Sequence, residues 1–61
     1  MDYFIVVENN KDQYDPKVLK YEGVKDGIKA IESLKFLTKT FAKEIEARTV
    51  KVYMVVENAV S

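Results

Sequence analysis

Two short apolar runs lie near the ends of the chain, and a longer amphipathic segment lies between them. The first run is Phe-Ile-Val-Val at residues 4–7, and the second is Tyr-Met-Val-Val at residues 53–56. Each is followed by Glu-Asn. Short runs rich in β-branched and aromatic residues predict strands. We therefore expect one strand over Tyr3–Asn9 and another from Thr49 or Val50 to Asn58.

The segment after the first run begins with a polar loop over residues 10–16. Asp15-Pro16 marks its end, because proline fixes its own φ and keeps the preceding residue out of the helical region. Residues 17–22 fit either a short second strand, hairpinned to the first, or an irregular arm. We favour the strand, because Val18, Leu19 and Tyr21 fit it.

The amphipathic segment predicts one helix from about Val24 to Ala47. At 100° per residue its apolar residues share one half of the helical wheel. Gly23 is the expected N-cap, although the helix could start near Asp26 because Gly27 weakens a first turn. The expected core stripe is Val24, Ile28, Ile31, Leu34, Leu37, Phe41, Ala42 and Ile45.

These elements predict a single small α+β domain over residues 1–61. With the hairpin, the element order is β-β-α-β, and the right-handed crossover rule favours strand order 2-1-3 with the last strand antiparallel to the first. Without the hairpin, the sheet is a two-stranded β-α-β unit. In either arrangement one long helix covers one face. Lys51 indicates that Tyr53 and its alternate neighbours face away from the helix.

The two terminal strands are apolar at consecutive positions, so each presents apolar side chains to both faces of its sheet. One helix can cover only one of these faces, and a 61-residue chain has a thin core. Without Cys or His, disulfides and the usual zinc sites cannot add stability. We therefore expect a homo-oligomer, most simply a dimer, that buries the second face. The candidate interface residues are Tyr3, Ile5, Val7, Tyr53 and Val55.

A second candidate surface is a ridge on the outer side of the expected helix. Its members, at helical spacing, are Lys25, Lys29, Phe36, Lys39 and Lys43. Such a ridge could dock an unidentified protein, or bind single-stranded nucleic acid by stacking a base on the aromatic ring and attracting phosphates with the lysines. Ten basic and ten acidic residues cancel, so no overall positive field favours phosphate backbones. Nucleic acid is therefore the less favoured partner.

No motif in the chain predicts catalysis, and no cofactor or metal is expected. Nucleophile–base pairs built on Cys or His cannot form within one chain, so an enzyme would need residues from several subunits. No apolar run is long enough to span a membrane, and the first residues lack the basic region of a signal peptide. We expect a cytoplasmic protein that acts by protein–protein association, as adaptors, inhibitors and phage-type accessory proteins do.

Overall fold

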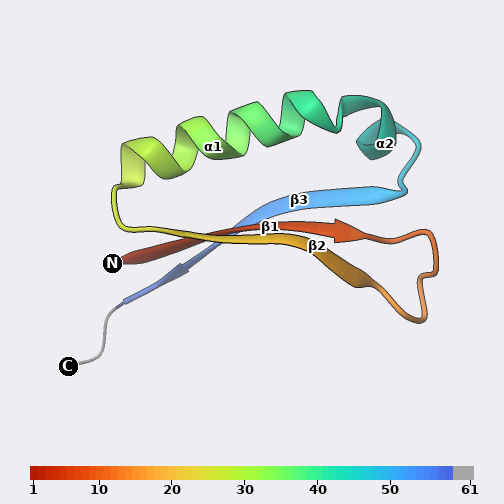
Figure 1. Ribbon diagram of the computed structural model, residues 1–61, viewed down its shortest axis with the longest axis horizontal. Helices are drawn as coiled ribbons and strands as arrows, with labels where there is room; N and C mark the ends of the chain where they lie inside the picture. Colours follow the sequence, from red (N-terminus) through yellow and green to blue (C-terminus); the bar gives the residue numbers. More distant parts are fainter. Residues whose placement is uncertain (59–61) are drawn as a thin grey trace.

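The computed structural model describes residues 1–58, which form a three-stranded sheet and two helices (Figure 1). The chain order confirms the β-β-α-β arrangement, with the helical segment between the second and third strands. In chain order the elements are β1 Asp2–Asn9, β2 Lys17–Val24, α1 Gly27–Thr40, α2 Ala42–Glu46 and β3 Val50–Glu57.

The sheet has the order β2-β1-β3, and both outer strands run antiparallel to β1. The predicted order 2-1-3 and the hairpin strand at residues 17–22 are therefore confirmed, with β2 reaching Val24. The β1–β2 pairing shifts register between Val7 and Glu8, so Leu19 has no partner. The β1–β3 pairing is regular along its whole length.

Helix α1 begins later than the favoured start at Val24, which belongs to β2. Asp26 is the N-cap, and its Oδ1 accepts hydrogen bonds from the backbone N–H groups of Ile28 at 2.9 Å and Lys29 at 3.4 Å. Gly27 permits a close approach to β1, because a Cβ there would lie 3.0 Å from the Tyr3 hydroxyl. The start near Asp26 is thus the correct alternative.

The predicted single helix is divided at Phe41, which separates α1 from α2. Thr38 and Thr40 donate their side-chain hydroxyls to the carbonyls four residues earlier, at 2.7 and 2.9 Å. Such back-bonding in the last turn competes with the helical ladder and bends helices. The prediction of one uninterrupted helix to Ala47 is therefore wrong.

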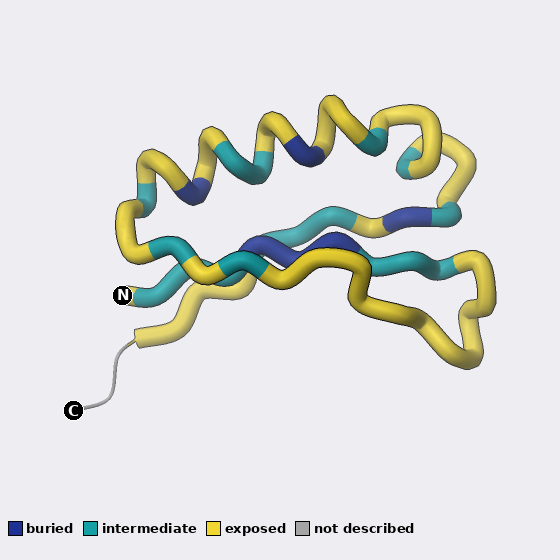
Figure 2. The backbone as a smooth tube through the Cα atoms, viewed as in Figure 1, coloured by how far each residue is buried: buried dark blue, intermediate teal, exposed yellow. Residues whose placement is uncertain are grey.

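The core lies between α1 and the sheet (Figure 2). Its buried residues are Ile5, Val7, Ala30, Leu37 and Val50. The predicted core stripe is partly wrong, because Ile28 and Ile31 are 73% and 48% exposed. Small residues explain this rotation: Gly27 and the fully buried Ala30 bring the helix backbone close to β1. Ile31 consequently lies on a flank of α1, and Ile28 lies on its outer side.

Helix α2 ends in a Schellman motif that turns the chain directly into β3. The N–H of Thr49 donates to the carbonyl of Glu44 at 2.9 Å, and the N–H of Arg48 donates to Ile45 at 3.0 Å. Arg48 has φ 62°, the left-handed conformation that this motif requires. The turn brings Val50 into the core with no further linker.

Candidate association surface

The face of the sheet away from α1 carries an apolar cluster that draws on all three strands. Because side chains alternate along a strand, residues opposite one another in the register share a face. Val6 lies opposite Tyr21 on one side and Tyr53 on the other, and Phe4 lies opposite Val55. We call these residues the open-face cluster: Phe4, Val6, Tyr21, Tyr53 and Val55.

Aromatic rings give this cluster its shape. The rings of Phe4 and Tyr21 stack at 5.2 Å between centroids with an interplanar angle of 18°. Val6, between Tyr21 and Tyr53, is only 4% exposed although it lies on the face of the sheet away from α1. Tyr21 itself is 61% exposed. The open face is therefore an aromatic surface built around a valine that the neighbouring side chains already exclude from water.

A polar group borders the cluster at one end. The Tyr53 hydroxyl donates a hydrogen bond to Glu8 Oε2 at 3.0 Å, and Lys51 Nζ lies 5.2 Å from the centre of the Tyr53 ring. The hydrogen bond to the Glu8 carboxylate raises the pKa of Tyr53, and burial and the Glu8 charge act in the same direction. The phenol is therefore held in its neutral form, as an oriented donor.

The structure divides the predicted interface residues between the two faces. Tyr53 and Val55 lie on the open face, as predicted from Lys51, while Val52 and Met54 pack against the core. Tyr3, Ile5 and Val7 lie beneath α1 instead: Ile5 and Val7 are fully buried, and Tyr3 packs beside them. Their assignment to an intersubunit contact is corrected, because these side chains are used within the chain.

Phe4, Val6 and Tyr21 are the open-face residues that sequence reasoning missed. An apolar β1 offers no polar residue before Glu8 to mark its solvent side, and a shift of one residue exchanges its two faces. The usable signal was the pairing of Glu8 with Lys51, since opposite charges favour facing positions. That pairing sets Phe4 and Val6 on the same face as Lys51.

The structure divides the lysine ridge among three segments. Lys25 lies in the turn before α1, Lys43 lies in α2, and only Lys29, Phe36 and Lys39 share α1. All five are exposed, and the Phe36 ring is 68% exposed. The straight ridge that a single helix would present is therefore interrupted at both ends.

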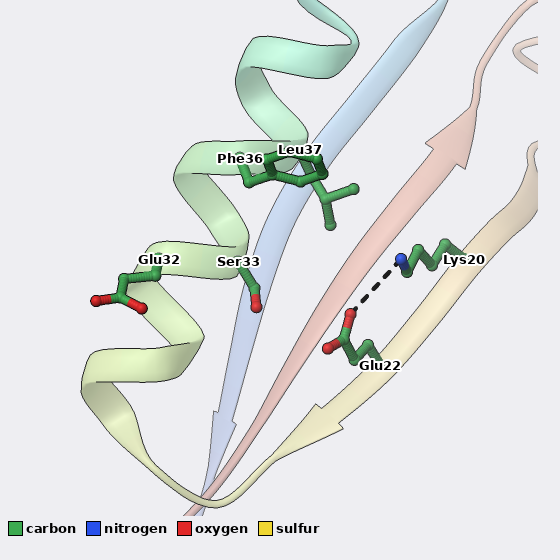
Figure 3. A pocket seen from close by; sticks show the side chains of 6 residues that line it. All are labelled: Lys20, Glu22, Glu32, Ser33, Phe36 and Leu37. Atoms are coloured by element: carbon green, nitrogen blue, oxygen red, sulfur yellow. Dashed lines mark ion pairs between the residues drawn. The ribbon is translucent and has the colours of Figure 1, made fainter.

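A shallow groove of about 260 Å³ separates α1 from β2 (Figure 3). Its lining residues are Lys20, Glu22, Glu32, Ser33, Phe36 and Leu37. Lys20 Nζ and Glu22 Oε2 form an ion pair at 3.7 Å, and Glu32 points away from that pair (Figure 3). The groove shows that α1 leaves part of β2 uncovered on the helix side of the sheet.

Other classes of site have no support among residues 1–58. No group of three or more acidic, His or Cys side chains is placed to hold a metal ion in this part of the chain. None of its helices combines the length and the apolarity needed to cross a bilayer. No protein-family model matches the chain, and comparisons with curated proteins and with solved structures give no match.

Proposed function

We propose that this protein acts by protein–protein association, and that a second copy of the chain covers the open face of its sheet. The observation that carries the proposal is the open-face cluster. Aromatic side chains are enriched at protein interfaces, where large rigid rings contribute most of the binding energy. A sheet that is apolar on both faces is normally covered by a layer on each, and this sheet has a helical layer on one face.

Charge favours a second copy as the occupant. Asp2 and Glu57, which lie opposite one another in the β1–β3 pairing, are at one end of the open face, and Lys51 is at the other end, opposite Glu8. A two-fold axis perpendicular to the strands would place each Asp2 near Lys51 of the second copy. Two-fold contacts use the same patch on both subunits, so such self-complementary charge is what a homodimer needs.

Light scattering coupled to size exclusion tests this proposal with a matched pair of tyrosine variants. At micromolar concentration we expect a mass at least twice the 7.0 kDa of one chain. Tyr21→Lys should weaken association by roughly thirtyfold, the effect of losing an interface residue worth about 2 kcal/mol. Tyr14→Lys makes the same change in an exposed loop and should leave the mass unchanged. A wild-type protein that elutes as a monomer contradicts the proposal.

The exposed Phe36 favours a second candidate, binding of single-stranded nucleic acid. Together with Leu34, Thr38 and the lysines at 35 and 39, it lines a hollow on α1. An aromatic ring between lysines could stack on a base while the amines contact phosphates. Binding of a labelled oligonucleotide should then fall steeply as salt is raised, and Phe36→Ala should reduce it. Absence of binding at low salt removes this candidate.

A further inference from the structure

The free edge of β3 differs from that of β2. Each outer strand has β1 as its only neighbour, so the backbone groups on its other side have no strand partner within residues 1–58. Natural edge strands are usually protected from further pairing by charges, proline or bulges. β2 has such protection in its register shift at Leu19 and in its lysines at 17 and 20. β3 pairs regularly and is charged only at Lys51 and Glu57.

The two charges of β3 are placed symmetrically about Met54, with Lys51 three residues before it and Glu57 three residues after it. If two β3 strands pair antiparallel with Met54 opposite Met54, Lys51 of each copy lies opposite Glu57 of the other. All four side chains then lie on the open face, because residues 51 and 57 have the same parity. The same register sets Tyr53 opposite Val55 and Val52 opposite Val56, which are favourable cross-strand pairs.

Exposed apolar side chains continue this edge onto the helix. The groove residues Ser33 and Phe36 mark the flank of α1 that faces β2. On the helical wheel Ile31 lies across the buried row through Ala30 and Leu37 from the groove flank, and hence on the β3 side, whereas Ile28 lies opposite Leu37 on the outer side of α1. Both isoleucines are exposed, as is Val56 of β3. The β3 edge thus has an apolar margin above it.

We propose that β3 is a second association surface and that its partner is β3 of another copy, paired antiparallel about Met54. The result is a continuous six-stranded sheet with both α1 helices on the same side. This inference rests on the proposed self-association only in naming a second copy as the partner. It uses the edge of the sheet and the helix flank, whereas the open-face contact uses the aromatic cluster, and Lys51 takes part in both contacts.

The spacing of the helices agrees with this arrangement. Strands in a sheet lie about 4.8 Å apart, and α1 packs over β1 and β3 more than over β2. Two helices centred between β1 and β3 of their own chains would then lie about 10 Å apart across the two-fold axis. Packed helices have interaxial distances of about 8–10 Å. Ile31 would fill part of the space between the helices.

Registers shifted by two residues in either direction lack this complementarity. A shift that sets Tyr53 opposite Tyr53 leaves Lys51 opposite Val55, and the reverse shift sets Tyr53 opposite Glu57. A shift by a single residue does not form a ladder, because residues opposite one another must both direct their backbone groups toward the partner strand or both away from it. Charge therefore selects the register centred on Met54.

Zero-length carbodiimide cross-linking of the wild-type protein, followed by peptide mass spectrometry, tests the register. The reagent joins a lysine amine to a carboxylate in contact with it. Within one chain Lys51 and Glu57 lie about 20 Å apart along the strand, so a Lys51–Glu57 product reports pairing between copies. We expect this product in the wild type and in Tyr21→Lys. Its absence from both overturns the proposal.

Charge reversal supplies the matched control. Lys51→Glu and Glu57→Lys should each weaken edge pairing by about tenfold, because each places like charges opposite one another twice per dimer. The double variant restores opposite charges across the edge and should recover the cross-link between positions 51 and 57. Failure of the double variant to recover, with each single variant impaired, contradicts the register.

Ile31→Glu separates the two surfaces, because it alters only the helix flank. It should abolish the cross-link while leaving association through the open face intact. A cross-link that survives Ile31→Glu and disappears in Tyr21→Lys would come from face-to-face contact, and would overturn edge pairing without affecting the proposed function. Association lost only in Tyr21→Lys, with no Lys51–Glu57 product in any variant, leads to the same conclusion.

Discussion

At the scale of single residues, the bond between Tyr53 and Glu8 couples the open face to proton binding. The Tyr53 hydroxyl donates a hydrogen bond to the Glu8 carboxylate, and this bond is lost once the phenol has ionised. The pKa of Tyr53 is raised from its ordinary value of 10.0, mainly by that hydrogen bond and then by burial and the Glu8 charge. The neutral phenol is thus the form that the folded state favours.

This linkage predicts a loss of stability at high pH. A group whose pKa is higher in the folded chain binds more protons there, so its contribution is complete below about pH 10 and is lost as pH rises through the folded pKa. We expect the free-energy difference between wild type and Tyr53→Phe to shrink above that pH in urea unfolding. Tyr14→Phe, which makes the same change in an exposed loop, is the control.

Arg48 is the residue at which a simple substitution should stabilise the fold. Its φ of 62° places its Cβ against the following carbonyl, a conflict that glycine lacks. Arg48→Gly should raise the free energy of unfolding by about 0.5–1 kcal/mol, after the greater freedom of glycine in the unfolded chain is counted. Arg48→Val should lower it. Thermal melts of the three proteins give the order, and a less stable glycine variant would contradict the argument.

At the scale of elements, the start of α1 depends on one carboxylate. Asp26 Oδ1 accepts two backbone N–H groups that have no partner in the helix. Asp26→Ala should therefore lower stability by about 1 kcal/mol in denaturant unfolding, whereas Asp26→Asn keeps an accepting oxygen and should lose much less. Equal losses in both variants would mean that the charge, rather than the cap, is what stabilises the helix.

The sequence predicted each strand and the strand order but not the division of the helical segment. Apolar periodicity continues through Phe41, so the pattern alone favours one helix. The break follows two threonines, Thr38 and Thr40, whose hydroxyls bond to the backbone here and can bond to water instead. The composition of that turn permits both outcomes, and packing of α2 over β3 accompanies the bent one.

The candidate surface was predicted only for β3, because the two terminal strands differ in one polar residue. Lys51 interrupts the last strand and marks its outer face, whereas β1 is apolar from Tyr3 to Val7. For β1 the face is decided by register and by which residues fit beneath Gly27 and Ala30. Those are properties of packing between distant segments, which periodicity within one strand does not contain.

At the scale of the whole molecule, the proposed self-association predicts that stability depends on concentration. A dimer that unfolds to two chains gains about 1.4 kcal/mol in its free energy of unfolding for each tenfold rise in protein concentration. For two chains of this length the melting temperature should rise by about 5 °C per tenfold step. Calorimetry over two decades of protein concentration measures this rise in melting temperature. A constant melting temperature would indicate that the folded chain is stable alone.

The irregular pairing of β2 bears on how far such a sheet can grow. A subunit with two receptive edges would add copies at both sides and extend without limit, as strands do in amyloid fibrils. Here Leu19 interrupts the β2 register, and Lys17 and Lys20 add charge to the same strand. If β3 edges pair as proposed, each copy has one edge that pairs and one that is protected, so lateral addition should stop after a single step. The register shift in β2 would then limit the assembly to two copies of the sheet.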